Sequence, residues 1–512
     1  MSYDLALFNT ECYTLDQKKP KAQALGIKGN TVEEIGTNNK IREGTSNKTI
    51  EIDGEGRTLL PGFCDAHTHF GSLAIRLACY LDLGQVKSKR ELLERVRDEA
   101  AGRDREQWVI GVNWDESKWE GDRGFMTKGE IDSFVSQVPV ALERVDGHLA
   151  CVNSRALELL ELDPELKGVE REEGETTGRL LEEARFALRQ QIEPESEKVM
   201  EGLKQATELA HSLGITSVHD VWADQLRLKA YTGLWQKEEL NMRVSLFMGD
   251  EYLDEMIRLG LTTIGDAKLR IEGLKVFADG SIGAKTAWVS EGYQDNPDNR
   301  GYPIYEQDQL EEIILKAHRN GIKVALHVIG DLAIDAGLKA FERALRKHPA
   351  NIQHRLEHCE LITRKQIKEM KKLGLTASIQ PNFTGEWGHP GAMYTARFGS
   401  ERIKTMNPLR WLVEEEVPFL LGSDGMPFHA LFGLDSAINA PFKAQKLSVE
   451  NALLGYTGFH NQRFPGPRAG VIRRGHPADL VLLDGDPYQH PREIGEMEVK
   501  MTFFDGELVY SS

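Results

Sequence analysis

The sequence has little cysteine, no excess of positive charge and no long hydrophobic run, and each shortage excludes a class of protein. Its five cysteines are scattered and include no Cys-x-x-Cys pair, which argues against a disulfide framework and favours reduced thiols. The formal net charge of -17 argues against binding to a nucleic-acid backbone or an anionic membrane surface. No segment approaches the roughly 18 apolar residues of a membrane-spanning helix, and no signal peptide is visible. We therefore expect a cytoplasmic protein with no nucleic-acid or membrane partner.

The composition is that of a folded chain with more than one domain. It is 40% hydrophobic and 28% charged over 512 residues, which is too long for a single ordinary core. Short alternating segments separated by Gly, Asn and Asp turns occur at both ends, as in "YDLALFNTECYTLD" and "MEVKMTFFDGELVYSS". This pattern predicts one composite β-domain, a small split β-sandwich, built from residues 1–60 and 466–512, with residues 61–465 inserted between its halves.

The middle of the chain alternates short apolar runs with amphipathic segments. Eight runs recur: "LLPGFCDAH", "GITSVHD", "MRVSLFMG", "IEGLKVFADG", "GIKVALHVIG", "IQHRLEHCEL", "GLTASIQP" and "VPFLLGSDG". Buried strands that alternate with helices indicate a parallel sheet covered by helices, and eight such units indicate a (β/α)8 TIM barrel of the α/β class. The first two runs are separated by far more than the other pairs, which predicts an inserted subdomain over about residues 73–200, after barrel strand 1.

Polar side chains stand at the ends of five of these runs, where a barrel of this kind has its active site. They are His67 and His69 on the first run, Lys275 on the fourth, His327 on the fifth, His358 on the sixth and Asp424 on the eighth. Any one of them has an ordinary structural explanation, such as a strand-end hydrogen bond or a helix cap. Together they predict a site for zinc or a similar divalent metal, because neutral imidazole and carboxylate suit such ions. His67 and His69, two residues apart on a strand, point to the same face.

The ligand order and the surrounding phrases resemble those of the amidohydrolase superfamily. The phrases are "PGFCDAHTHF", "WVIGVNWDESKW", "RVDGHLACVNS", "GETTGRLLE", "GLKVFADGSIGAKTA", "HVIGD" and "GSDGMP", which span residues 61–427. They are most similar to the amidohydrolase-3 branch, which contains YtcJ-like and N-substituted formamide deformylase-like proteins. The split β-domain of the two termini also fits this resemblance.

The resemblance implies a role for each ligand residue. His67 and His69 would bind one Zn2+, and His327 and His358 would bind a second. Lys275 would be carboxylated and would bridge the two ions, and Asp424 would contact one metal and act as the catalytic proton shuttle. The implied activity is hydrolysis of a C–N bond in an amide, N-formyl compound or cyclic amide by metal-bound hydroxide.

Other residues and functions remain open at this point. Five further residues are candidates for substrate contact, and each also has a structural explanation: His148, His219, Trp114, Trp387 and Asp279. Trp119 is a further candidate for an apolar substrate wall. The alternative functions are a mononuclear-metal deaminase or isomerase on the same fold, and a non-catalytic barrel that binds without turnover. The partner we expect is a small-molecule substrate, and the sequence leaves a homodimer open.

Overall fold

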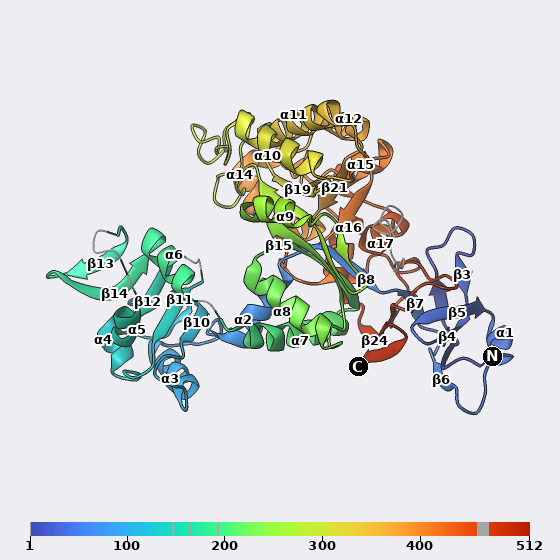
Figure 1. Cartoon of the computed structure of the whole chain (residues 1–512), viewed down its shortest axis with the longest axis horizontal. Helices are drawn as coiled ribbons and strands as arrows, with labels where there is room; N and C mark the ends of the chain where they lie inside the picture. Colours follow the sequence, from blue (N-terminus) through green and yellow to red (C-terminus); the bar gives the residue numbers. More distant parts are fainter. Residues whose placement is uncertain (1, 146–147, 161, 163–165, 193, 458–469) are drawn as a thin grey trace. The chain divides into compact units, whose positions relative to one another are not determined.

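The computed structural model describes residues 2–145, 148–160, 162, 166–192, 194–457 and 470–512. The chain forms two compact units (Figure 1). Unit 1 comprises Met1–Gly71 and Ala206–Ser512, and unit 2 comprises Ser72–Gln205. None of the helices in the described ranges is long and apolar enough to cross a lipid bilayer.

A (β/α)8 barrel forms most of unit 1, which confirms the predicted fold class. Its parallel strands follow one another in chain order and match the eight apolar runs: β8 (Phe63–Thr68), β15 (Ile215–Ala223), β16 (Arg243–Gly249), β18 (Leu269–Phe277), β19 (Lys323–Val328), β20 (Arg355–His358), β21 (Thr376–Ile379) and β22 (Phe419–Leu421). The short strand β17 (Ile264–Gly265) pairs antiparallel with β18. The barrel strands are buried along most of their length because helices cover them from outside, which explains their continuous apolar character.

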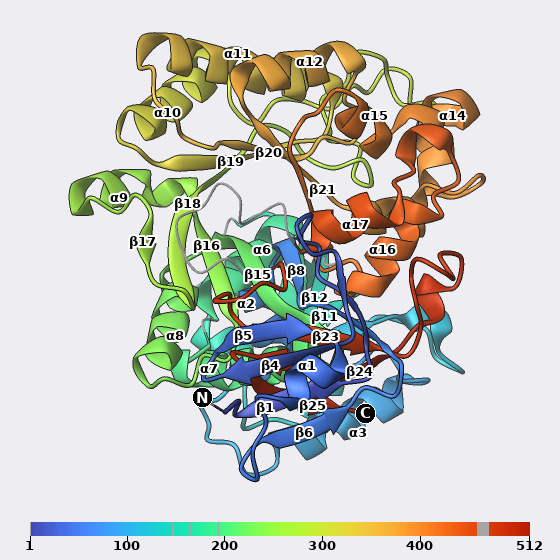
Figure 2. The ribbon, with the colours of Figure 1, turned by 90° about the vertical axis from the view of Figure 1, so that its right-hand side faces the viewer.

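Amphipathic helices cover the outer face of the barrel. Helices α10 (Gln307–Arg319) and α11 (Asp331–Lys347) pack against β19, and α12 (Arg364–Leu373) packs beside α11 (Figure 2). Helix α12 begins with a capping box, in which Thr363 and Gln366 satisfy each other's backbone amides, and ends at Gly374 with φ of 66°. These start and stop signals set the length of the connection between β20 and β21.

Two sheets form the composite β-domain from both ends of the chain. One has the order β5 (Thr31–Gly36), β4 (Ala24–Lys28), β1 (Leu5–Phe8) and β6 (Ile50–Asp53). The other has the order β25 (Glu507–Ser511), β24 (Val499–Phe504), β23 (Leu480–Leu483), β7 (Thr58–Pro61), β2 (Glu11–Tyr13) and β3 (Lys21–Ala22). Leu7 and Leu25 of the first sheet share a core with Leu59, Leu480 and Phe503 of the second. The predicted boundary at residue 466 lies outside the described residues.

Unit 2 contains a sheet whose two faces are both buried. The strand order is β13 (Val169–Glu172), β14 (Glu175–Leu181), β12 (Leu149–Val152), β11 (Val140–Arg144), β10 (Val109–Trp114) and β9 (Tyr80–Asp82). Side chains alternate between two apolar cores, so that Val140 and Leu142 enter one and Ala141 enters the other. Helix α3 (Lys89–Ala100) contributes to the first core and α6 (Glu182–Gln191) to the second.

Candidate metal centre

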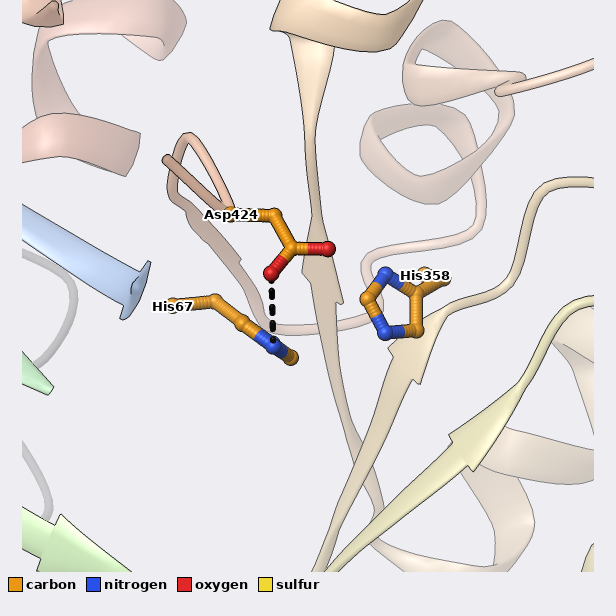
Figure 3. A group of neighbouring side chains, drawn as sticks. All are labelled: His67, His358 and Asp424. Atoms are coloured by element: carbon orange, nitrogen blue, oxygen red, sulfur yellow. Dashed lines mark ion pairs between the residues drawn. The ribbon is translucent and has the colours of Figure 1, made fainter. Parts of the chain in front are cut away.

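Three side chains that lie far apart in the sequence meet at the carboxyl ends of the barrel strands. They are His67 at the end of β8, His358 at the end of β20 and Asp424 just after β22 (Figure 3). Each offers one ligand atom, and the three atoms lie within 4.8 Å of one another. His67 Nε2 lies 3.7 Å from Asp424 Oδ1. Two imidazoles and a carboxylate at this separation can hold one divalent cation.

A buried carboxylate holds the loop that carries Asp424 against the strand that carries His67. Asp65 Oδ1 accepts a hydrogen bond from the Ser423 amide at 2.9 Å, and the Ser423 hydroxyl donates to the same carboxylate. The Asp424 amide donates to the His67 carbonyl at 2.7 Å. A Cβ atom at Gly422 would lie 2.4 Å from the backbone nitrogen of His67, so only glycine permits the two strands to approach this closely. Strands β8 and β22, the two ends of the strand order, are therefore joined at the candidate centre.

His67 is oriented by a carboxylate that is itself oriented by an arginine. Its Nδ1 lies 2.5 Å from Glu357 Oε2, and both side chains are fully buried. Arg355 donates to both oxygens of Glu357, from Nε at 2.6 Å and from Nη2 at 2.8 Å. Burial would raise the pKa of Glu357, but the charge and hydrogen bonds of Arg355, the charge of Lys275 and a hydrogen bond from Ser378 together outweigh burial, and the pKa is lowered. Glu357 is therefore ionised and accepts the Nδ1 proton, which leaves Nε2 of His67 as a lone-pair donor.

The two other buried histidines of the predicted ligand set, His358 and His327, are held in defined tautomers in the same way. His358 Nδ1 donates to Gln380 Oε1 at 2.7 Å, so its Nε2 carries the lone pair. His327 Nε2 donates to the Gly280 carbonyl at 3.0 Å, so its lone pair is on Nδ1. The two ring centroids are 4.5 Å apart. Burial lowers the pKa of His358 well below its usual value and that of His327 to about 3, so both rings are neutral near pH 7.

Lys275 and His69 complete the predicted ligand set. Lys275 is 1% exposed, and its Nζ has no hydrogen-bond partner among the residues that the structure describes. Burial lowers the pKa of Lys275 to about 8, against the opposing charges of Glu357 and Asp424. His69 is partly exposed, and its Nε2 lies 3.0 Å from Asp424 Oδ1.

These residues fit a divalent metal on three observations about this chain. His67 Nε2 is a buried nitrogen with no hydrogen-bond partner in the described part of the chain, and Asp424 Oδ1 lies 3.7 Å from it. In His67, His327 and His358, one ring nitrogen donates a hydrogen bond and the other therefore has a lone pair available to a metal ion. Lys275 Nζ is also buried and unpartnered, and a buried amine that is left unpaired is costly unless something binds it.

Several residues that support the centre were absent from the sequence prediction. They are Asp65, Arg355, Glu357 and Gln380, and each of these residues is less than 5% exposed to solvent. The sequence does carry a signal for Arg355 and Glu357, because two opposite charges stand inside "HRLEHCEL", a run that its apolar pattern predicts to be a buried strand. Strict alternation also fails at the end of β20, because His358 has φ of 69° and Cys359 has φ of 53°. Glu357 and His358 can therefore both contact His67.

The predicted substrate contacts in unit 1 have different surroundings. Asp279 is fully buried, and its carboxylate accepts hydrogen bonds from three backbone amides, those of Trp288 at 2.9 Å, Ile329 at 3.0 Å and Gly330 at 2.8 Å. This enclosed carboxylate anchors loops, and a substrate contact at Asp279 remains a prediction. His219 Nδ1 accepts a hydrogen bond from Arg355 at 2.8 Å.

Trp387 lies on helix α13 (Pro381–Trp387), with ring centroids 5.2 Å from Phe383 and 6.1 Å from Tyr394. Phe383 in turn stacks on His358 at 6.0 Å. The substrate contacts predicted at His219 and Trp387 remain predictions.

The predicted substrate contacts in unit 2 are one core residue and one surface residue. Trp114 is fully buried and stacks on Trp119 with ring centroids 5.7 Å apart, so packing accounts for its position, and a substrate contact at Trp114 remains a prediction. His148 is exposed, and its Nδ1 lies 3.0 Å from Glu182 Oε2. A substrate role for His148 remains a prediction.

Comparison with known protein families shows which family this chain belongs to. The family model described as the amidohydrolase family matches residues 51–510. The chain belongs to the amidohydrolase family.

Individual amidohydrolase relatives align with nearly the whole chain. YtcJ of Bacillus subtilis is 28% identical over 97% of this chain and 98% of its own length. An N-substituted formamide deformylase of Arthrobacter pascens is 26% identical over 99% of this chain and 98% of its own length. The crystal structure of an uncharacterised metal-dependent hydrolase from Pyrococcus furiosus is 31% identical, with a TM-score of 0.82, over 94% of this chain and 99% of that one. These relatives support a hydrolase that uses a divalent metal.

Proposed function

We propose that this amidohydrolase cleaves the C–N bond of an amide, an N-formyl compound or a cyclic amide. The observation that carries the proposal is that His67, His358 and Asp424 each place a ligand atom within 4.8 Å of the others at the carboxyl ends of the barrel strands. The A. pascens relative is described as acting on N-substituted formamides, which places one full-length relative on this class of bond.

The proposed cofactor is a pair of Zn2+ ions. His67 and His69 would hold one, His327 and His358 the other, with Lys275 as a carboxylated bridge and Asp424 on one ion. Such ions, when bound, polarise a carbonyl group and lower the pKa of a bound water. Support for the modified lysine comes from its buried, unpartnered Nζ, whose pKa of about 8 leaves a usable share of neutral amine near pH 7. The amine nitrogen would attack carbon dioxide, forming a new N–C bond and releasing one proton.

Asp424 is the proposed proton shuttle. Burial would raise its pKa, but the hydrogen bond from His69 and the electrostatic effect of the surrounding imidazoles and Lys275 outweigh burial, and the pKa is lowered. The carboxylate is therefore ionised at neutral pH and can accept the proton of the attacking water. It would then deliver that proton to the leaving nitrogen as the C–N bond breaks, which yields a carboxylic acid and an amine.

We further propose a reducing, cytoplasmic setting and a small-molecule substrate. The structure contains five free cysteines and no disulfide among the described residues, which supports a reducing compartment. The net charge of -17 supports a small-molecule substrate over a polyanion.

Metal stoichiometry and turnover together test this function. Elemental analysis of protein purified without chelator should find about two equivalents of zinc or a similar ion, and the loaded protein should hydrolyse members of an N-formyl and N-acyl amine series. One equivalent, with deamination or isomerisation instead of hydrolysis, would favour the mononuclear alternative. No metal after incubation with Zn2+ and bicarbonate, and no turnover, would leave the non-catalytic barrel as the remaining function.

A matched pair of lysine variants tests the bridge. Lys275→Ala should lose metal and activity, and added formate or acetate should restore part of both by supplying the missing carboxylate. Lys323→Ala is the control, because Lys323 is a second buried barrel lysine with pKa lowered by burial to about 8, but it is paired with Glu272. The control should keep its metal, and carboxylates should not affect it. Equal metal loss in both variants would contradict a bridging role.

A further inference from the structure

Asp279 is a fully buried carboxylate that lies two residues after Phe277, the last residue of β18. Its hydrogen-bond partners within the described part of the chain are the backbone amides of Trp288, Ile329 and Gly330. Trp288 belongs to the segment that follows β18, whereas Ile329 and Gly330 directly follow β19. One side chain therefore joins the backbone after the fourth barrel strand to the backbone after the fifth.

The same residues also hold His327 at the end of β19. The carbonyl of Gly280, the residue after Asp279, accepts a hydrogen bond from His327 Nε2 at 3.0 Å. The carbonyl of His327 accepts one from the amide of Ala278, also at 3.0 Å. The amide of Ile329, two residues after His327, donates to Asp279 Oδ1 at 3.0 Å. The ring of His327 and the backbone on both sides of it are thus held by three consecutive residues centred on Asp279.

His327 differs from the other buried candidate ligands in the nitrogen that it leaves for a metal. His67 and His358 donate from Nδ1 to a side-chain oxygen, whereas His327 donates from Nε2 to a backbone carbonyl. A side-chain acceptor can be oriented by its own neighbours, but the direction of a carbonyl follows from the path of the backbone. The position of the free Nδ1 of His327 therefore depends on whatever fixes the backbone at Asp279 and Gly280.

We propose that Asp279 is a positioning residue for the metal ion of His327, because it fixes the carbonyl that orients the His327 ring. This inference rests on the proposed function, in which His327 and His358 hold one of two ions. Groups that orient a metal ligand in this way strengthen metal binding although they do not touch the ion.

The position requires a carboxylate and not merely a polar side chain of the same size. One backbone amide faces Oδ1 of Asp279, and two face Oδ2. An asparagine would direct its own amide hydrogens at a backbone N–H in either orientation, because both oxygen positions of the carboxylate face donors. Asp279→Asn should therefore release the two segments although it keeps the volume of the side chain.

The first test compares Asp279→Asn with Asp331→Asn as a matched control. Asp331 also joins the segments after β18 and β19, because its carboxylate accepts from the Ser290 amide at 2.9 Å and from the Ser290 hydroxyl. That hydroxyl can reverse its role and accept a hydrogen bond from an asparagine. Asp279→Asn should bind one of two zinc ions about 10- to 100-fold more weakly and keep the other, whereas the control should bind both as the wild type does. Equal weakening of both ions would show that Asp279 only supports the fold, and would overturn the proposal.

A second readout requires neither metal nor turnover. In chelator-treated protein labelled with 15N-histidine, Nε2–H of His327 should give a nuclear magnetic resonance signal that is protected from exchange with water. His327→Gln assigns this signal by removing it. Asp279→Asn should lose the signal while its near-ultraviolet circular dichroism stays that of a folded protein, and Asp331→Asn should keep it. A wild-type signal from Nδ1–H instead of Nε2–H would overturn the proposal before any variant is compared.

The two readouts separate failure of this inference from failure of the proposed function. If Asp279→Asn loses the His327 signal but binds metal as the wild type does, Asp279 does orient the ring and the assignment of His327 as a ligand falls. If the variant keeps both the signal and both ions, the inference falls and the proposed function stands.

Hydrogen exchange in the wild type decides the question if Asp279→Asn does not fold. The backbone amides of Trp288, Ile329 and Gly330 and the ring N–H of His327 should then become exposed in one common opening event, because a single side chain holds them. A His327 ring proton that exchanges independently of the three amides would overturn the proposal.

Discussion

The side chains buried at the mouth of the barrel are mostly polar or charged, whereas those buried in unit 2 are mostly apolar. In the barrel, the buried groups around the centre are histidines, a lysine and the Arg355–Glu357 pair. In unit 2, the corresponding space holds aliphatic side chains around the stacked pair Trp114 and Trp119. Unit 2 also buries Glu143, which pairs with Arg185, but the buried charges of the barrel gather around the candidate centre.

The difference shows what each interior contributes. An apolar core stabilises the fold through burial and close packing. A buried ion pair contributes little net stability compared with apolar side chains of the same volume, but breaking it is costly because one charge is left unpaired. We therefore interpret the barrel network as a device for orienting ligand atoms, and the unit 2 core as the source of that unit's stability.

The largest effect should come from breaking the pair that orients His67. Glu357→Ala removes the acceptor of the His67 Nδ1 proton and leaves the buried charge of Arg355 without the carboxylate that neutralises it. We expect a loss of about 3–5 kcal/mol of unfolding free energy and 10- to 100-fold weaker metal binding. Urea unfolding of the chelator-treated protein and zinc titration measure the two effects. Glu416→Ala, at an exposed pair with Lys371, is the control and should change neither.

The next effect tests the other interior. Trp114→Ala should lower the free energy of unfolding by about 3–5 kcal/mol, because it removes a fully buried indole and the ring that stacks on Trp119. The metal content should be unchanged, since all six candidate ligands lie in unit 1. Unfolding followed by circular dichroism, together with elemental analysis, provides the check. A variant of normal stability with altered substrate preference would support a substrate contact at Trp114 and contradict a packing role.

Acid should act on the barrel through its buried histidines, whereas unit 2 contains a single histidine, the exposed His148. Burial lowers the pKa of His354 to about 3, and its Nδ1 accepts the Val324 amide hydrogen at 3.0 Å. The unfolded chain binds a proton below about pH 6.5 and the folded chain does not until about pH 3, so stability is lost as the pH falls through this window.

His354→Asn keeps an acceptor near Val324 and removes this titration. Between pH 7 and pH 5 the variant should lose about 2 kcal/mol less than the wild type, as measured by urea unfolding without metal. His490→Asn, at an exposed histidine, should leave the wild-type difference intact. An equal loss in wild type and His354→Asn would show that His354 is not neutral in the folded state.

The smallest effect should come from the edge of the ionic network. Ser378→Ala removes one hydrogen bond from Arg355 Nη2, which is 3.1 Å long, but the same nitrogen still donates to the Ala66 carbonyl and to Glu357. We expect a loss of about 0.5–1.5 kcal/mol and unchanged zinc affinity. Weaker zinc binding in this variant would mean that the orientation of His67 depends on every contact of Arg355, and that the network acts as one unit.

The barrel strands and the groups at their ends could be predicted from the sequence because both depend on local patterns. Short apolar runs followed by amphipathic segments determine a parallel sheet, and parallel strands in a barrel present their carboxyl ends at one face. His67, His358 and Asp424 could therefore be placed together without coordinates. Trp114 could not be assigned, because an isolated tryptophan has the same local signal in a core as in a substrate wall.

By itself, the sequence determined the α/β barrel, the split β-domain and the six candidate ligands, because the period of its apolar residues and the ends of its runs encode them. Only the tertiary structure decided the tautomers of His67, His327 and His358 and the contact between Trp222 and Phe277. It also decided the pairing of His67 with Glu357, which lies 290 residues away in the sequence. The physical reason is that these properties depend on which side chains meet across strands. Such meetings follow from register, bulges and positive φ values at strand ends, which leave no periodic trace in the sequence.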